Sequence, residues 1–97
     1  MYIIEVPQQL FELGEVFATP GALDALAAAG IMHTALIARH IAGDWGDLDA
    51  EDKESNQLAL ETGARILSAY SLPTKQRIWV ITEADRSVTT LLLPNEY

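Results

Sequence analysis

The hydrophobic pattern of this chain changes its period at Gly63. Up to that residue the apolar side chains recur mainly at helical spacing, and beyond it they alternate at every second position, as in strands. The alternation predicts strands at residues 64–72, 76–83 and 88–93, joined by connections short enough for an antiparallel meander. Helices followed by a meander favour an α+β fold.

The segment up to Gly30 predicts one strand and one helix. Residues 12–18 alternate as a strand does. Thr19 is the predicted N-cap of the helix, and Pro20 suits the first helical position, where its missing N–H would be unpaired anyway. Gly30 is the predicted left-handed C-cap. The expected apolar stripe of this helix consists of Leu23, Leu26 and Ala27.

Two further helices are predicted in the middle of the chain. Apolar spacing indicates one at residues 33–42, and Asp49 is the predicted N-cap of another that ends at Gly63. The loop between these helices contains Trp45 and Leu48. Because both side chains are large and apolar, we expect them to anchor the loop to the core.

The chain is expected to form one domain over residues 1–97, because this length supports a single core. The sheet is predicted to be antiparallel and to consist of one N-terminal strand and the three-stranded meander. About three helices are expected to pack on one of its faces. Residues 1–12 show no clean period and are expected to form an extended arm or an edge strand.

Negative charge is concentrated in the middle of the chain. The net charge is −8, and residues 44–61 contain seven acidic residues and one lysine. Because phosphates and anionic lipids repel such a chain, we expect no direct binding to nucleic acid or membranes. Two interpretations stay open: a solubilising surface, or a surface that binds a basic partner. The candidate partner-binding residues are Asp44, Asp47, Asp49, Glu51, Asp52 and Glu54.

A second candidate surface lies on the predicted meander. Arg77 and Trp79 are two residues apart in one strand and therefore point to the same side, and Arg86 follows in the next turn. An arginine beside an exposed tryptophan can stack nucleic-acid bases, or it can form a cation–π pair that covers the sheet. The acidic excess of the chain favours the cation–π pair.

No motif indicates catalysis or a bound metal. The chain has no cysteine, which excludes disulfides and thiolate sites. The spacing of His33 and His40 matches no zinc signature, so capping or core-edge histidines are the simpler interpretation. An EF-hand loop starting at residue 47 fails, because Asp52 replaces its glycine and Leu58 its final glutamate. We expect no metal, no cofactor and no enzymatic activity; the alternative is an enzyme with an unrecognised carboxylate site.

The sequence predicts a soluble, cytoplasmic protein. Glu5 and Pro7 interrupt the early hydrophobic residues, so no export signal is expected. The longest nearly apolar stretch, residues 25–32, is far shorter than a membrane span. The absence of cysteine fits a reducing compartment.

Several segments resemble a family of small bacterial proteins carried on plasmids and other mobile elements. They are Ala-Arg-His at 38–40, Gly-Asp-Trp-Gly-Asp-Leu at 43–48, Arg-Ile-Leu-Ser-Ala-Tyr at 65–70, Ile-Trp-Val-Ile-Thr-Glu-Ala-Asp-Arg-Ser at 78–87, Leu-Leu-Leu-Pro at 91–94 and the terminal Glu-Tyr. The resemblance covers much of residues 37–97 and none of the first 12. The family is described as plasmid-related proteins of unknown function, sometimes as a restriction-system subunit, and implies no catalytic role.

The resemblance implies a context of conflict with host defence. Mobile elements carry small acidic inhibitors of CRISPR and restriction systems, and such inhibitors present carboxylates to a basic nucleic-acid channel. The implied function is a non-enzymatic inhibitor that binds the basic surface of a defence complex made of protein, or of protein and RNA. The alternative is a plasmid accessory protein, structural or regulatory, that self-associates through its sheet as a homodimer.

Overall fold

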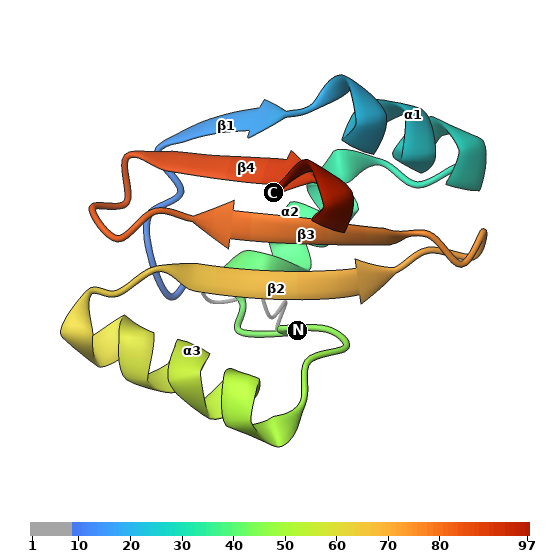
Figure 1. Cartoon of the computed structure of the whole chain (residues 1–97). Coiled ribbons are helices and arrows are strands. Elements are labelled where there is room, and N and C mark those ends of the chain that lie inside the picture. Colours follow the sequence, from blue (N-terminus) through green and yellow to red (C-terminus); the bar gives the residue numbers. More distant parts are fainter. Residues whose placement is uncertain (1–8) are drawn as a thin grey trace, which may run out of the picture.

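The computed structural model describes residues 9–97, which form a four-stranded sheet with three α-helices and a short 3₁₀ helix (Figure 1). This part of the chain confirms the α+β class. In chain order, the elements are β1 (Glu15–Ala18), α1 (Pro20–Ala29), α2 (His33–Ile41), α3 (Ala50–Thr62), β2 (Ile66–Ser71), β3 (Arg77–Thr82), β4 (Val88–Leu92) and the 3₁₀ helix η1 (Pro94–Glu96). Most of the arm or edge strand expected within residues 1–12 lies outside the described residues; residues 9–12 form neither a helix nor a strand.

The sheet has the strand order β1-β4-β3-β2. The predicted meander is confirmed, because β2, β3 and β4 pair in sequence with antiparallel neighbours. The expectation of a wholly antiparallel sheet is wrong, since β1 pairs with β4 in parallel from Glu15↔Val88 to Ala18↔Leu91. The physical reason is the long connection: three helices and two strands separate β1 from β4, and a long crossover can return a strand in either direction.

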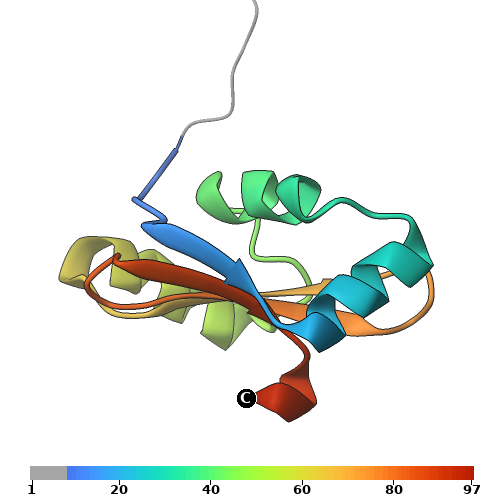
Figure 2. The same ribbon diagram turned by 90° about the horizontal axis from the view of Figure 1, so that it is seen from above.

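The helices do not all pack on one face of the sheet, which corrects the second part of the expected fold. Helices α1 and α2 share a core cluster with Tyr70, Val80 and Leu91 on one face. Helix α3 instead runs along the β2 edge (Figure 1), and η1 lies on the side of the sheet opposite to α2 (Figure 2). Helix α3 buries only Asn56 and Ala59, so it lacks the apolar stripe that would cover a sheet face.

The helix boundaries confirm the capping predictions. The hydroxyl of Thr19 accepts a hydrogen bond of 3.1 Å from the N–H of Ala22, and Gly30 ends α1 with φ +68°. The predicted apolar stripe of α1 is wrong in part: Leu23 is 48% exposed and Ala27 is exposed. The side chains that α1 buries are two alanines and one leucine, Ala22, Ala25 and Leu26. Because alanine side chains are short, the helix can approach the sheet closely on this side.

A second, smaller core cluster lies beneath the loop between α2 and α3. It consists of Phe11, Trp45, Ala59 and Ile66, with Leu48 packed against it. Trp45 is 4% exposed, which confirms that it anchors the loop to the core. Because Ala59 belongs to α3 and Ile66 to β2, this cluster fixes the loop and the helix to one end of the sheet.

No single helix within residues 9–97 is long and apolar enough to cross a membrane. Helices α1 and α2 meet the length and composition only as a pair, and the chain bends by 103° between them. Their buried side chains, among them Leu26 and Leu36, pack against the sheet.

Candidate functional site

The acidic segment forms the loop after α2 and the first turns of α3. Asp49 caps α3, because its Oδ1 accepts a hydrogen bond of 2.8 Å from the backbone N–H of Asp52. Glu51 and Asp52 occupy the first turn, where the positive end of the helix dipole favours carboxylates. The sequence therefore places negative charge where it also stabilises the helix.

The side-chain amide of Asn56 fixes α3 to β2. Its Nδ2 donates to the backbone carbonyl of Leu67 at 2.7 Å, and the N–H of Leu67 donates to its Oδ1 at 3.1 Å. One side chain thus pairs with an edge strand in the way that a neighbouring strand would. Asn56 is 4% exposed, so water does not compete strongly for these two bonds.

The loop before α3 is bonded to the same strand. Ala69 donates its N–H to the carbonyl of Trp45 at 3.1 Å, and its own carbonyl accepts from the N–H of Asp47 at 2.7 Å. Gly46, between Trp45 and Asp47 in the chain, has φ +75°, and a Cβ at this position would collide with the carbonyl oxygen of Ala69. Glycine is therefore required for this close approach, and the loop carboxylates are held on a fixed backbone.

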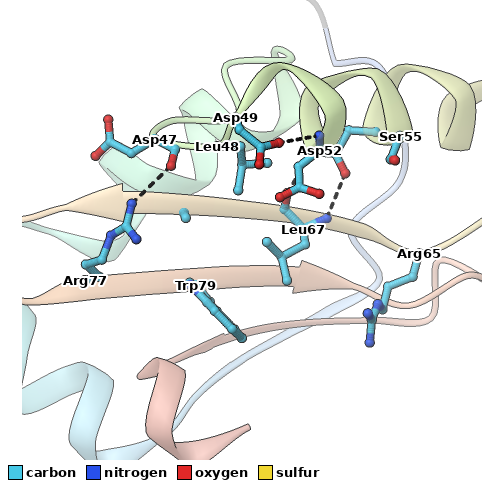
Figure 3. Close-up of a pocket in the computed structure, with 11 residues that line it drawn as sticks. Asp47, Leu48, Asp49, Asp52, Ser55, Arg65, Leu67, Arg77 and Trp79 are labelled. Carbon is cyan, nitrogen blue, oxygen red and sulfur yellow. Dashed lines mark hydrogen bonds between the residues drawn. The ribbon is translucent and has the colours of Figure 1, made fainter.

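A groove of about 590 Å³ lies between α3 and the outer face of the sheet, which is the face turned away from α1 and α2 (Figure 3). The lining residues from the loop and α3 are Asp47, Leu48, Asp49, Asp52, Ser55 and Asn56. Those from the sheet side are Arg65, Leu67, Ala69, Arg77 and Trp79. Arg65 and Arg77 lie at opposite ends of the sheet side, with Trp79 between them (Figure 3). The groove thus has an acidic wall and a floor that is apolar in its middle.

Five of the six predicted partner-binding carboxylates lie at or beside this groove, but they point in two directions. Asp47, Asp49 and Asp52 line it. Glu51 and Glu54 are exposed on α3 and do not line it. A hydrogen bond with Ser71 is the main reason that the pKa of Asp47 lies below its ordinary value, so this carboxylate is ionised at neutral pH.

The sixth carboxylate, that of Asp44, is paired within the chain. Its Oδ2 lies 2.7 Å from Nε of Arg39, and its Oδ1 accepts from the N–H of Gly46 at 3.2 Å. The hydrogen bond with Arg39 is the main cause of the lowered pKa of Asp44. The guanidinium of Arg39 also lies 4.5 Å above the ring of Tyr70. Asp44 therefore has a structural role that accounts for its presence without a partner.

Only two of the three residues of the second predicted surface lie at the groove. Arg77 and Trp79 line the groove, and Arg77 donates to the carbonyl of Asp47 at 3.1 Å. Trp79 packs against Tyr97, with ring centroids 5.8 Å apart, and not against Arg77. Arg86 lies elsewhere, because its guanidinium donates to four backbone carbonyls around the end of α3 and the β3–β4 turn. The acceptors are those of Ala59, Ala64, Glu83 and Ala84.

Three residues that belong to neither predicted surface shape the groove. Asn56 positions the wall of the groove, and Arg65 and Tyr97 border its floor. The guanidinium of Arg65 lies 5.4 Å from the centroid of the Tyr97 ring and donates a hydrogen bond to the Tyr97 hydroxyl. The only local signal for Asn56 is that asparagine is itself an unfavourable residue in a helix interior. Arg65 and Tyr97 are far apart in the sequence, so no spacing rule connects them.

The two histidines do not build a metal site in the described part of the chain. Residues 9–97 contain no group of three or more His, Asp or Glu side chains placed to hold a metal ion. His33 is exposed at the start of α2, whereas His40 is completely buried. The ring nitrogens of His40 are bonded to the hydroxyls of Ser68 at 2.6 Å and Thr82 at 2.9 Å. His40 is therefore a core residue with both nitrogens satisfied.

Replacing Asn56 by alanine is expected to lower the free energy of unfolding by about 1–3 kcal/mol, because the N–H and carbonyl of Leu67 both lose their partner. Urea unfolding followed by circular dichroism measures this loss. The amide of Leu67 should also exchange faster with deuterium. Gln57→Ala, on the adjacent exposed position, is the control and should change little. Equal stabilities of the two variants would contradict the role of this amide.

Comparison of the chain with protein-family models, with curated proteins and with solved structures gives no match.

Proposed function

We propose that the protein is a non-enzymatic binding protein whose acidic face engages a basic surface of a nucleic-acid-targeting defence complex and inhibits it. The acidic face is defined as Asp47, Asp49, Glu51, Asp52 and Glu54. The observation that carries the proposal is that these five carboxylates make no ion pair within residues 9–97, where the only such pair joins Arg39 and Asp44. Their field is therefore directed at the solvent.

Rigidity supports a binding role over a merely solubilising one. A solubilising surface needs no fixed geometry, whereas here Asn56, Trp45 and Gly46 fasten the acidic face to the sheet. Preorganised charges lose little conformational entropy on binding, so they contribute more to affinity than mobile ones. The apolar floor beside the carboxylates also offers desolvated contact area, which exposed charges alone lack.

The proposed class of partner rests on the resemblance of the sequence to mobile-element proteins and on charge. A complex that guides or cleaves nucleic acid must have a positively charged channel. Carboxylates at fixed positions compete with phosphates for such a channel. Binding is expected to weaken as salt rises, because the attraction between the two surfaces is screened.

The test uses a purified type I CRISPR surveillance complex and a purified type I restriction enzyme as probes. In the variant, all five carboxylates of the acidic face are replaced by their amides: Asp47→Asn, Asp49→Asn, Glu51→Gln, Asp52→Asn and Glu54→Gln. Asparagine is as good an N-cap as aspartate, so α3 should stay intact. Affinity for the complex is expected to fall at least about 100-fold, since two close charge pairs at about 1.5 kcal/mol each already reach that factor.

A matched control removes the same number of charges elsewhere on the surface. It consists of Glu12→Gln, Glu15→Gln, Asp24→Asn, Glu61→Gln and Glu83→Gln, all at exposed positions. The control should keep its affinity and block target DNA binding as the parent does. Equal affinity of the two variants, or no binding of the parent to either complex, would contradict the proposal.

A further inference from the structure

The two edges of the sheet differ in whether their backbone groups have partners. At the β2 edge, the outward N–H and carbonyl of Leu67 are bonded to Asn56, and those of Ala69 are bonded to the loop before α3. Helix α3 also runs along this edge (Figure 1). The β2 edge is therefore closed to another strand.

The β1 edge is open in the part of the chain that the structure describes. Glu15 donates its N–H to Ser87 and Thr19 donates its N–H to Leu91, both towards β4. Because backbone groups alternate along a strand, those of Val16 and Ala18 point away from β4, where residues 9–97 provide no further strand. Figure 2 looks onto this edge, and no described element lies over β1.

The open edge also exposes apolar side chains. Val16 is 44% exposed and Phe17 is 52% exposed, and they project from opposite sides of β1. Natural edge strands are usually protected by charges, prolines or bulges. In β1 only Glu15 is charged, and it lies at the end of the strand.

We propose that β1 pairs antiparallel with β1 of a second copy of this chain, across a twofold axis. The outward groups fix the register: Val16 of each copy exchanges hydrogen bonds with Ala18 of the other. Phe17 then lies opposite Phe17 of the second copy in a non-hydrogen-bonded pair, where side chains come closest. The two four-stranded sheets become one continuous sheet.

A second copy fits this edge better than an unrelated strand, for two reasons. In the twofold register Glu15 faces Thr19 of the other copy, so no carboxylates oppose each other within the ladder. The pairing also closes at two copies, because the β2 edge is blocked and cannot extend the sheet further. A sheet with only one open edge is thus suited to a dimer and not to a filament.

Salt should strengthen this association. Each copy has a net charge of −8, so the two copies repel each other at long range and screening reduces that repulsion. Binding to a basic partner through the acidic face should respond in the opposite way. The two associations are therefore separable: either can fail while the other holds.

Sedimentation equilibrium of the full chain, from micromolar to millimolar concentration and at low and high salt, tests the proposal. The mass is expected to rise from 10.6 kDa towards twice that value with increasing concentration, and to rise earlier at high salt. A mass of 10.6 kDa under all these conditions would overturn it, even if the chain bound an added β-strand peptide at the same edge.

Two variants locate the interface. Phe17→Lys would place two ammonium groups opposite each other across the axis, and Val16→Pro would remove an N–H that points away from β4 and that the proposed dimer uses. Both should shift the dissociation constant at least tenfold towards monomer. Met32→Lys is the matched control: it makes the same charge change at a side chain that is 70% exposed at the start of α2, and it should dimerise as the parent does. Unchanged association of Phe17→Lys, with a normal circular dichroism spectrum, would overturn the proposed interface.

Discussion

Replacing Trp45 by alanine is expected to lower the free energy of unfolding by about 3–5 kcal/mol. The indole ring is 4% exposed and packs against the rings of Phe11 and His40. Its centroid is 6.3 Å from that of Phe11, in a stacked arrangement, and 6.0 Å from that of His40, edge to face. Removing the ring leaves a cavity that neither the loop nor α3 can fill without moving.

Urea unfolding followed by far-ultraviolet circular dichroism is the suitable measurement, since the substitution removes a fluorophore. Trp79→Ala is the control, because it removes the same side chain from a half-buried position on the outer face. Its cost should be clearly smaller. A midpoint for Trp45→Ala equal to that of the parent would contradict the anchoring role of the ring.

Lowering the pH from about 6.5 to about 4 is expected to destabilise the fold by roughly 3 kcal/mol through His40. Burial lowers the pKa of His40 from 6.5 to about 4. Within this window the unfolded chain binds a proton that the folded chain does not, so stability falls as the pH falls. Below about pH 4 the folded state also binds the proton, and the contribution of His40 levels off.

The measurement is the free energy of unfolding in urea at intervals between pH 7 and pH 4. Carboxylates whose pKa is lowered in the fold, such as Asp44 and Glu96, lose their contribution only near and below their ordinary values of 3.8 and 4.5. The upper part of the window therefore reports on His40. In His40→Gln the overall stability should be lower but the slope between pH 6.5 and 4.5 should be flat. A parent protein with no slope there would contradict the buried neutral histidine.

The local features of the fold were predictable because each depends on a few adjacent residues. Thr19 and Asp49 each supply an oxygen at a helix start, and Gly30 and Gly63 adopt positive φ at helix ends. The parallel pairing of β1 with β4 was not predictable in this way. It depends on how far the chain travels between the two strands, and hydrophobic alternation is the same for parallel and antiparallel neighbours at an edge.

The candidate site was predictable in composition but not in arrangement. The density of carboxylates is visible in the sequence, yet nothing local distinguishes Asp44, which pairs with Arg39, from Asp47, which lines the groove. Arg86 likewise resembles a surface arginine until its backbone acceptors are known. Arg39 and Asp44 are only five residues apart, but their pairing depends on how the chain turns after α2. The assignment of Arg86 depends on acceptors 22 and 27 residues away.

Hydrogen–deuterium exchange of the protein, free and bound to the defence complex, tests most directly whether the acidic face is the binding surface. We expect protection on binding at residues 47–56 and along the groove floor at 65–69 and 77–79, with no change at α1. Protection confined to other parts of the chain, with the acidic face exchanging as in the free protein, would contradict the account.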